Sequence, residues 1–360
     1  MPSVVASQVL TPDGLVGPAC VTWADGVITS VAPAAHAPER TLSPGFVDLQ
    51  VNGIADVDVA QARGEDWNRL DELLLAQGVT SWCPTLVTMP LDRYTAPLDR
   101  ISAAMSRPHR PRPQIVGAHL EGPFLGRAPG AHPVGQIIPI DLEWLAALPR
   151  HVAVVTLGAE QPLAAAATRL LTDRRCLVSI GHSRAIDVEF DAVAHAGAGL
   201  TTHLFNGMSG VHHRDPGVAV WALTNPAVCA SLIADGVHVH PRVLQLAFQA
   251  LGRGRAVLVT DAVAWRAGRA GSIQLEWRDG APRLPDGTLA GSGVTMDEAV
   301  RVCVAAGVPL AAALEAASVT PARLLGLADR GRIEVGARAD LVALDPDLQI
   351  EQVWVGGSPA

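Results

Sequence analysis

Apolar, β-branched runs alternate with stretches able to form helices through most of this chain. Eight such runs follow Ser43, and the intervening segments 163–171 and 188–195 are clear helix candidates. The eight runs lie at residues 45–51, 80–86, 114–120, 152–157, 176–180, 199–204, 228–233 and 256–260. Buried strands that alternate with helices predict an α/β fold, a (β/α)₈ TIM-type barrel over residues 43–334.

Short strands are predicted at both ends of the chain. An Asp25-Gly26 turn separates two of them near the N-terminus, and Asp345-Pro346 separates two near the C-terminus. We expect residues 1–42 and 335–360 to meet in one small β-sandwich domain. A further hairpin is expected near 272–290, with an Asp286-Gly287 turn, ahead of helices at 296–304, 310–317 and 321–325.

The composition is that of a soluble globular enzyme, and it narrows the chemistry. No apolar run is long enough to span a membrane, and the N-terminus lacks the layout of a signal peptide, so we expect a cytoplasmic protein. The net charge of −8 comes without a basic stripe, which argues against nucleic acid as a partner. Five scattered cysteines without a CxxC motif favour neither disulfides nor a thiolate zinc site.

The chain contains no lysine at all. A Schiff base, a lysine general base and a carboxylated lysine that bridges two metals are therefore excluded.

Ionisable residues gather where the apolar runs end. Glu121, His182, His203, Asp235 and Asp261 each stand at or just beyond such an end. The carboxyl ends of barrel strands line the active site, so these side chains are expected to converge. Glu121, His182 and His203 form a ligand set of the kind that holds a catalytic divalent metal, zinc above all, with one position open for water.

Strand one carries Gln50 and Asn52 on one face, where a two-metal site would need histidines. Amides are poor zinc ligands beside imidazole and carboxylate. Together with the missing lysine, this predicts one metal ion per subunit, with Gln50 and Asn52 as hydrogen-bonding groups around it. His119 shares a strand face with Glu121, so we expect it to orient that carboxylate.

Asp261 ends the eighth apolar run and is the best candidate for carrying protons to and from a reacting group. A site for a phosphate is suggested by Asn206-Gly207, Arg214 and His238, because turn amides with an arginine and a histidine suit a polyanion.

Several short motifs, spread in order over the whole chain, are together very specific. They are Ser43-Pro-Gly-Phe-Val-Asp48, His119-Leu-Glu-Gly-Pro-Phe124, Gly181-His-Ser183, Thr202-His-Leu-Phe-Asn206, Ile233-Ala-Asp-Gly-Val-His238, Val259-Thr-Asp-Ala262, Leu289-Ala-Gly-Ser292 and Thr320-Pro-Ala-Arg323. In order and spacing the chain resembles the N-acetylglucosamine-6-phosphate deacetylases of the amidohydrolase superfamily.

The resemblance implies hydrolysis of the N-acetyl group of N-acetylglucosamine 6-phosphate, to glucosamine 6-phosphate and acetate. It implies one metal ion on Glu121, His182 and His203, with Asp261 as the catalytic acid/base and His132 polarising the acetyl carbonyl. It also implies a homodimer, with the phosphate read partly across the interface. The implied substrate contacts are Ala131, His132, Asn206, Gly207, Arg214, Asp235, Gly236, Val237, His238, Leu289, Ala290 and Gly291.

Three alternatives stay open. The sugar could be the epimer N-acetylgalactosamine 6-phosphate or another N-acyl sugar phosphate. A cyclic-amide hydrolase of the same superfamily is disfavoured by the missing lysine, and an inactive binding protein is disfavoured by the intact ligand set. Two loops depart from the family pattern, residues 133–138 and 262–271, the second with Trp265-Arg266; both are expected to border the sugar pocket.

Overall fold

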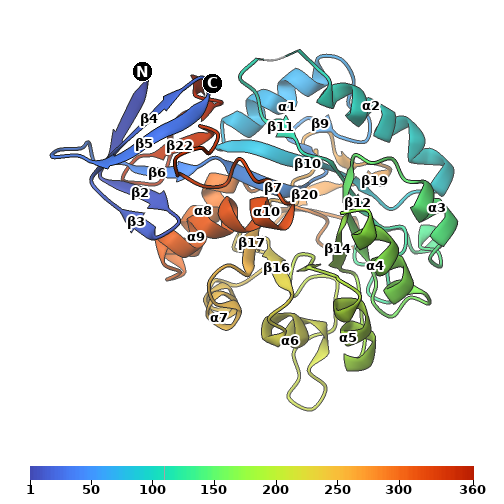
Figure 1. The fold of residues 1–360 in the computed structure, drawn as a ribbon. Helices are drawn as coiled ribbons and strands as arrows, with labels where there is room; N and C mark the ends of the chain where they lie inside the picture. Colours follow the sequence, from blue (N-terminus) through green and yellow to red (C-terminus); the bar gives the residue numbers. More distant parts are fainter. Residues whose placement is uncertain (109) are drawn as a thin grey trace.

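In the computed structural model, which describes residues 1–108 and 110–360, parallel strands form a nearly closed barrel (Figure 1). The barrel strands are β7 (Phe46–Val51), β10 (Val79–Val87), β11 (Gln114–Ile115) with β12 (Ala118–Glu121), β13 (Val152–Leu157), β14 (Leu177–Ile180), β15 (Leu200–Thr201), β16 (Cys229–Leu232) and β17 (Ala256–Leu258). The end of the barrel closes through a parallel bridge between Val51 and Ala262, and Asn52 N donates to Ala262 O over 2.8 Å. The predicted fold class is confirmed.

Helices surround these strands in the ribbon view (Figure 1). They are α1 (Asp66–Leu75), α2 (Thr95–Met105), α3 (Leu142–Ala147), α4 (Ala164–Asp173), α5 (Asp187–His195), α6 (Gly217–Thr224), α7 (Pro241–Leu251), α8 (Met296–Ala305), α9 (Leu310–Ala317) and α10 (Val319–Leu324), with 3₁₀ turns η1 (Leu91–Arg93) and η2 (Val134–Gln136). In α7 the residues at i, i+3, i+4 and i+7 from Leu244 to Leu251 are buried against the barrel. Pro241 opens this helix, where a missing N–H costs nothing.

The two chain ends meet in a β-sandwich, as predicted. One sheet has the order β1 (Ser3–Ala6), β4 (Ala19–Ala24), β5 (Val27–Pro33). The other runs β24 (Ser358–Pro359), β23 (Ile350–Val355), β22 (Leu341–Leu344), β6 (Thr41–Pro44), β2 (Gln8–Thr11), β3 (Gly14–Val16). Val21, Trp23 and Leu341 are fully or almost fully buried between them. Because β6 crosses residue 42, the exact domain boundaries stay a prediction.

The structure differs from the predicted elements in three places. The third strand is broken at Gly117, where a Cβ would lie 2.3 Å from Ala153 Cβ. The sixth strand keeps only two residues, because the backbone turns out of the sheet at His203, whose φ is +31°. The inserted segment forms two hairpins, β18 (Arg269–Ala270) with β19 (Ile273–Gln274) and β20 (Glu276–Arg278) with β21 (Ala281–Arg283), and the second turns at Asp279-Gly280.

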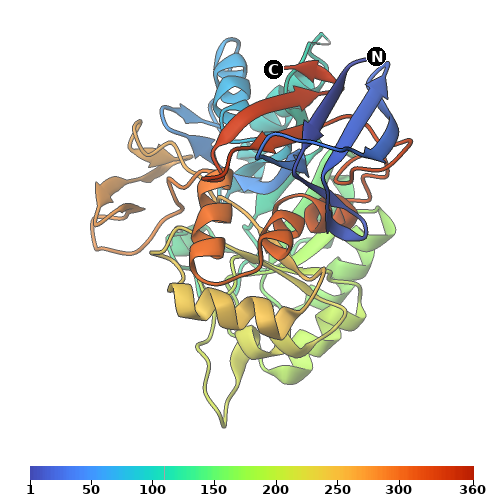
Figure 2. The same ribbon diagram turned by 90° about the vertical axis from the view of Figure 1, so that its left-hand side faces the viewer.

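This inserted segment stands beside the barrel in the rotated view (Figure 2). None of the helices in the described part of the chain is both long and apolar enough to cross a membrane.

Candidate metal centre and substrate pocket

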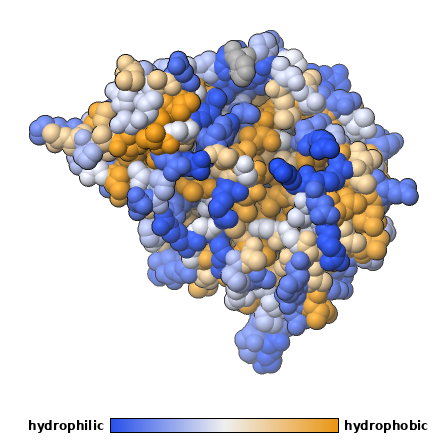
Figure 3. All heavy atoms as spheres, viewed as in Figure 1, coloured by the Kyte–Doolittle hydropathy of each residue, from blue (hydrophilic) through white to orange (hydrophobic). Residues whose placement is uncertain are grey.

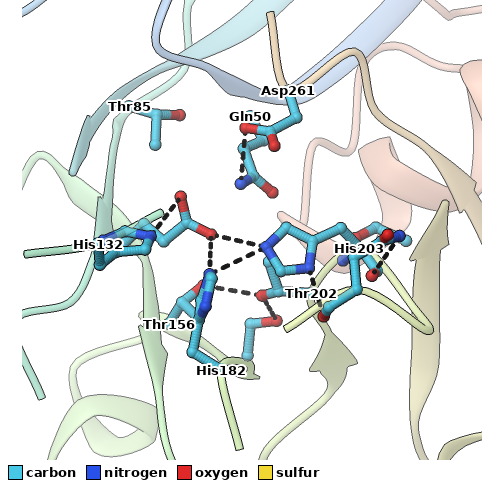
Figure 4. Close-up of polar contacts among 12 residues, drawn as sticks. Gln50, Thr85, His132, Thr156, His182, Thr202, His203 and Asp261 are labelled. Carbon is cyan, nitrogen blue, oxygen red and sulfur yellow. Dashed lines mark hydrogen bonds and ion pairs between the residues drawn. The ribbon is translucent and has the colours of Figure 1, made fainter. Parts of the chain in front are cut away.

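Glu121, His182 and His203 converge at the carboxyl ends of three barrel strands. Glu121 is the last residue of β12, and each histidine lies two residues beyond the end of β14 or β15. Both histidines have positive φ, +48° and +31°, which is strained for residues other than glycine. Because the backbone turns at each histidine, its side chain no longer follows the alternation of side chains along the strand. Figure 4 shows both rings pointing toward a common point.

Three lone pairs face one another at that point. Glu121 Oε1 lies 3.2 Å from His182 Nε2 and 3.0 Å from His203 Nε2, and the two Nε2 atoms are 3.1 Å apart. The Nδ1 atom of His182 faces Ala128 O at 3.0 Å and that of His203 faces Asn206 O at 3.1 Å. Carbonyl oxygens only accept, so each Nδ1 carries its proton, and in the neutral ring each Nε2 is left with a lone pair.

Such an arrangement suits a metal ion. A proton on one imidazole would satisfy one of the three contacts, whereas a cation satisfies all three. Tetrahedral zinc with bonds of ~2.0–2.1 Å places its ligand atoms about 3.3 Å apart, close to the spacing found here. Burial would lower the pKa of His203, but the neighbouring Glu121 carboxylate outweighs it and raises that pKa. Burial would raise the pKa of Glu121, but the neighbouring imidazoles of His182 and His203 outweigh it and hold that pKa well below its usual range.

His132 stands at the edge of the same cluster. With Glu121 and His182 it offers ligand atoms that all lie within 4.8 Å of one another, and its Nε2 is 3.7 Å from Glu121 Oε2. Its Nδ1 contacts Thr88 Oγ1 at 2.8 Å. Burial, followed by the neighbouring imidazole of His182, lowers the His132 pKa to about 3, which favours the neutral ring. His132, predicted to polarise the acyl carbonyl, therefore lies beside Glu121 and His182.

Asp261 is fixed in one orientation by the two amides of strand one. Gln50 Nε2 donates to Asp261 Oδ1 over 3.0 Å and Asn52 Nδ2 donates to the same oxygen over 2.7 Å. Figure 4 shows Gln50 and Asp261 facing each other. Burial and the charge of Glu121 raise the Asp261 pKa to about 8. Oδ1 is occupied, so Oδ2 is the oxygen available for proton transfer.

Glu160 ties the loop after β12 to the loop that carries His182. Its Oε1 accepts from the backbone amides of Arg127 and Arg184, both over 2.7 Å, and Oε2 accepts from the Ser183 hydroxyl. Nothing in the sequence singles out Glu160, since an isolated glutamate in a loop carries no local signal.

A pocket with a volume of about 190 Å³ opens over the cluster. Its lining contains all four clustered residues and Asp261, and it includes most of the predicted substrate contacts. Those predicted contacts are Ala131, His132, Asn206, Gly207, His238, Leu289, Ala290 and Gly291. Val263 and Ala270 also line the pocket, and they belong to the loop 262–271 that was expected to border it. Lining residues that were not foreseen are Val87, Gly130, Ile233, Ile273 and Thr288.

Four of the predicted contacts do not line this pocket. Asp235 instead orients His238: its Oδ2 accepts from His238 Nδ1 over 2.6 Å, and its Oδ1 accepts from the amides of Val237 and His238. Gly236 and Val237 complete that turn outside the lining. Arg214 lies in the exposed segment 210–215, the loop that projects at the bottom of Figure 1 and ends in a hydrophilic tip in Figure 3.

His119 has partners other than Glu121. Its Nδ1 faces Leu49 O at 2.9 Å and its Nε2 faces Thr156 Oγ1 at 2.8 Å. With both ring nitrogens occupied, the ring has no hydrogen bond left for the carboxylate that we expected it to orient.

The fold and this strand-end cluster are those of a metal-dependent hydrolase of the amidohydrolase type, and the family model described as "Amidohydrolase family" matches residues 166–360. The chain is 36% identical to the N-acetylgalactosamine-6-phosphate deacetylase of Escherichia coli O157:H7, over 99% of this chain and 98% of that one. It is 39% identical to the N-acetylglucosamine-6-phosphate deacetylase of Bos taurus, over 88% and 82%.

Solved structures agree. The N-acetyl-D-glucosamine-6-phosphate deacetylase of Mycobacterium smegmatis, solved as a variant in complex with N-acetyl-D-glucosamine 6-phosphate, matches with a TM-score of 0.91 and 32% identity over 99% of this chain and 98% of that one. The enzyme of Thermotoga maritima matches with 0.90 and 31%, over 99% of both chains. The chain belongs to the N-acetylglucosamine-6-phosphate deacetylase family of the amidohydrolases, which confirms the resemblance read from the motifs.

Proposed function

We propose that this enzyme removes the N-acetyl group of N-acetylglucosamine 6-phosphate, giving glucosamine 6-phosphate and acetate. The observation that carries the proposal is the convergence of three lone pairs beside a carboxylate fixed by two amides. Family membership supports the same reaction.

Glu121, His182 and His203 would hold one divalent cation, and we propose zinc. Bound there, the cation lowers the pKa of a water molecule and polarises the acyl carbonyl. Gln50 and Asn52 use their amide N–H groups on Asp261, which supports a single ion rather than two.

In its carboxylate form, which a bound cation would favour, Asp261 accepts the proton of the attacking water at Oδ2 and then delivers it to the amine nitrogen as the C–N bond breaks. The two amides on Oδ1 keep Oδ2 turned to the pocket. His132 donates from Nε2 to the acyl oxygen, and this tautomer requires the Thr88 hydroxyl to donate to Nδ1. Asn52 Oδ1 is buried and has no hydrogen-bond partner among the described residues, so it is available to the substrate.

The phosphate would bind at Asn206, Gly207 and His238, which line the pocket. Arg214 lies outside this pocket in its own chain, which supports a homodimer in which Arg214 reaches the partner's phosphate.

The second candidate substrate is N-acetylgalactosamine 6-phosphate. It is favoured by the relative from Escherichia coli O157:H7, which aligns with 99% of this chain, against 88% for the Bos taurus relative.

The test is acetate release from both 6-phosphates and from unphosphorylated N-acetylglucosamine, with metal content measured on the same samples. The phosphorylated epimer with the higher kcat/KM identifies the substrate. Equal turnover of the unphosphorylated sugar would remove the phosphate site, and close to two ions per chain would remove the single-metal assignment.

Mixing two inactive variants tests the dimer. In a mixed dimer of Asp261→Asn and Arg214→Ala chains, the site with an intact Asp261 receives Arg214 only from its partner. Recovered activity on mixing supports the proposal. If a stable mixed dimer forms without activity, Arg214 acts in its own subunit or lies outside the site.

A further inference from the structure

A small apolar cluster lies apart from the barrel core. It consists of Val87, Val263, Ala270, Ile273, Leu275 and Ala290, with the partly buried Ala131, Trp265 and Leu284 packed against it. Most of these residues come from the segment between Asp261 and Gly291, which contains the two short hairpins that Figure 2 shows beside the barrel.

One side of this cluster is a wall of the substrate pocket. Six of its residues also line that pocket: Val87, Ala131, Val263, Ala270, Ile273 and Ala290. Leu275 belongs to the cluster and does not line the pocket. We call these six residues the apolar wall.

The apolar wall adjoins the reacting groups. Val87 is the register partner of Glu121 across the β10–β12 ladder. Val263 follows Asp261 by two residues, and Ala131 precedes His132. A carbonyl group placed between the metal ligands and Asp261 therefore has the apolar wall as its neighbour.

We propose that the apolar wall is the acyl subsite, and that Ile273 and Ala270 set the length of the acyl chain that the enzyme accepts. This rests on the proposed function. The attacked carbonyl carries a methyl group, whereas the sugar and phosphate present hydroxyls and charge. The methyl group is thus the part of the substrate that gains most from contact with apolar side chains.

The residues around the proposed subsite are closely packed. A Cβ at Gly271, between Ala270 and Ile273 in the chain, would lie 3.2 Å from Val87 Cγ2, so this hairpin turn is already close to β10. A Cβ at Gly291 would lie 2.4 Å from Val263 Cγ1. Closely packed neighbours cannot retreat to admit an extra methylene without cost.

Two tryptophans hold the inserted segment against the barrel. The rings of Trp265 and Trp277 have centroids 4.5 Å apart, and the Arg266 guanidinium lies 4.9 Å above the Trp265 ring. A Cβ at Gly293 would lie 2.7 Å from the Trp277 ring, so this glycine permits the ring to pack down. The wall that carries Ile273 is thereby fixed in place.

The reaction itself is unchanged by the acyl chain. Water adds to the acyl carbon, the C–N bond breaks, the amine takes the proton, and a carboxylic acid leaves in place of acetate. Only the fit of the chain against Ile273 and Ala270 differs between substrates.

The experiment measures kcat/KM of the metal-loaded enzyme for N-acetyl-, N-propionyl- and N-butyrylglucosamine 6-phosphate. The wild type should prefer acetyl over propionyl by about 10-fold or more, the usual effect of one methylene in an apolar pocket. Ile273→Ala should shift the propionyl-to-acetyl ratio toward propionyl by about 10-fold. Ala270→Val should shift it the other way, which keeps the test valid if the first variant folds poorly.

Leu275→Ala is the matched control, because Leu275 packs in the same cluster outside the pocket lining. Its ratio should stay within about 2-fold of the wild type, whereas a shift equal to that of Ile273→Ala would mean that a loosened hairpin explains the effect. If acetate is released but neither Ile273→Ala nor Ala270→Val changes the ratio, the acyl subsite is wrong and the proposed function stands. If the wild type hydrolyses none of the three substrates, the proposed function fails first.

Discussion

Histidines in two layers of the barrel interior differ in their hydrogen-bond partners. In the lower layer His119 binds a carbonyl and the Thr156 hydroxyl, which contacts Thr202 Oγ1 at 2.8 Å. At the rim, His182 and His203 each bind one carbonyl and turn the other nitrogen toward Glu121. Burial alone does not distinguish them, since all three are almost fully buried. The two proposed ligands differ from His119 in that the backbone pairs only one nitrogen of each ring, and the other nitrogen is left facing Glu121.

Removing the rim carboxylate should have the largest effect. Glu121→Gln replaces the charged ligand by an amide, which binds zinc poorly. We expect the metal content of the purified protein to fall to a small fraction of one ion per chain, and kcat/KM to fall by on the order of 10³ or more. Metal analysis and acetate release on the same sample provide the measurement. A variant that keeps its ion would show that His132, His182 and His203 suffice.

Asp261→Asn should separate metal binding from proton transfer. The two amide donors on Oδ1 can stay, but the group that carries the proton is lost. We expect kcat to fall by about 10²–10⁴-fold while the metal content is unchanged. A near-normal kcat with metal bound would take Asp261 out of its assigned role.

Changing the lower layer should affect stability and leave the ion in place. His119→Phe fills the space of the ring but removes the side-chain partner of Leu49 O, at a cost of about 1–3 kcal/mol. It also removes one of the two partners of the Thr156 hydroxyl, which keeps its contact with Thr202 Oγ1. We expect a lower free energy of unfolding in urea, with metal content like that of the wild type. Loss of the ion at full stability would instead show that His119 belongs to the metal site.

The cluster at the rim of the barrel could be predicted from the sequence. Barrel strands bring their carboxyl ends to one edge, and charged residues at those ends stand out against the apolar runs. The structure brings Glu121, His182 and His203 together as the strand pattern predicted. The sequence could not reveal that Val87 and Ile273 belong to the apolar wall, since they resemble core residues until the hairpins are placed in space. Nor could it assign His119, because strand alternation gives the face of a side chain and not its hydrogen-bond partners.

Asp48 and Asp261 show the same contrast between two buried carboxylates. Asp48 is buried below Asp261, and its partners are the Thr260 hydroxyl at 2.6 Å and the amides of Gln50 and Thr260. Burial, against these hydrogen bonds, raises its pKa from 3.8 to about 7. Unlike Asp261, it does not line the pocket.

The sign of its effect on stability follows from the raised pKa. Below about pH 4 the carboxyl is protonated in both the folded and the unfolded chain and has no effect on stability. As the pH rises toward 7, only the unfolded chain releases the proton, so stability falls, by on the order of 4 kcal/mol at most. Above pH 7 the penalty is constant. Asp48→Asn keeps an acceptor for the two amides and a donor for Thr260 Oγ1, and it removes the charge.

The variant should therefore match the wild type in free energy of unfolding below about pH 4, exceed it increasingly as the pH rises to about 7, and keep a constant advantage above that pH. Urea unfolding at a series of pH values, with metal supplied equally, measures the difference, and Asp191→Asn on the exposed face of α5 is the control for loss of a carboxylate. A pH-independent difference would mean that Asp48 is charged in the fold throughout this range. In that case a buried carboxylate needs neither a metal nor a proton here, and hydrogen bonds from Thr260 and Gln50 are enough to hold it.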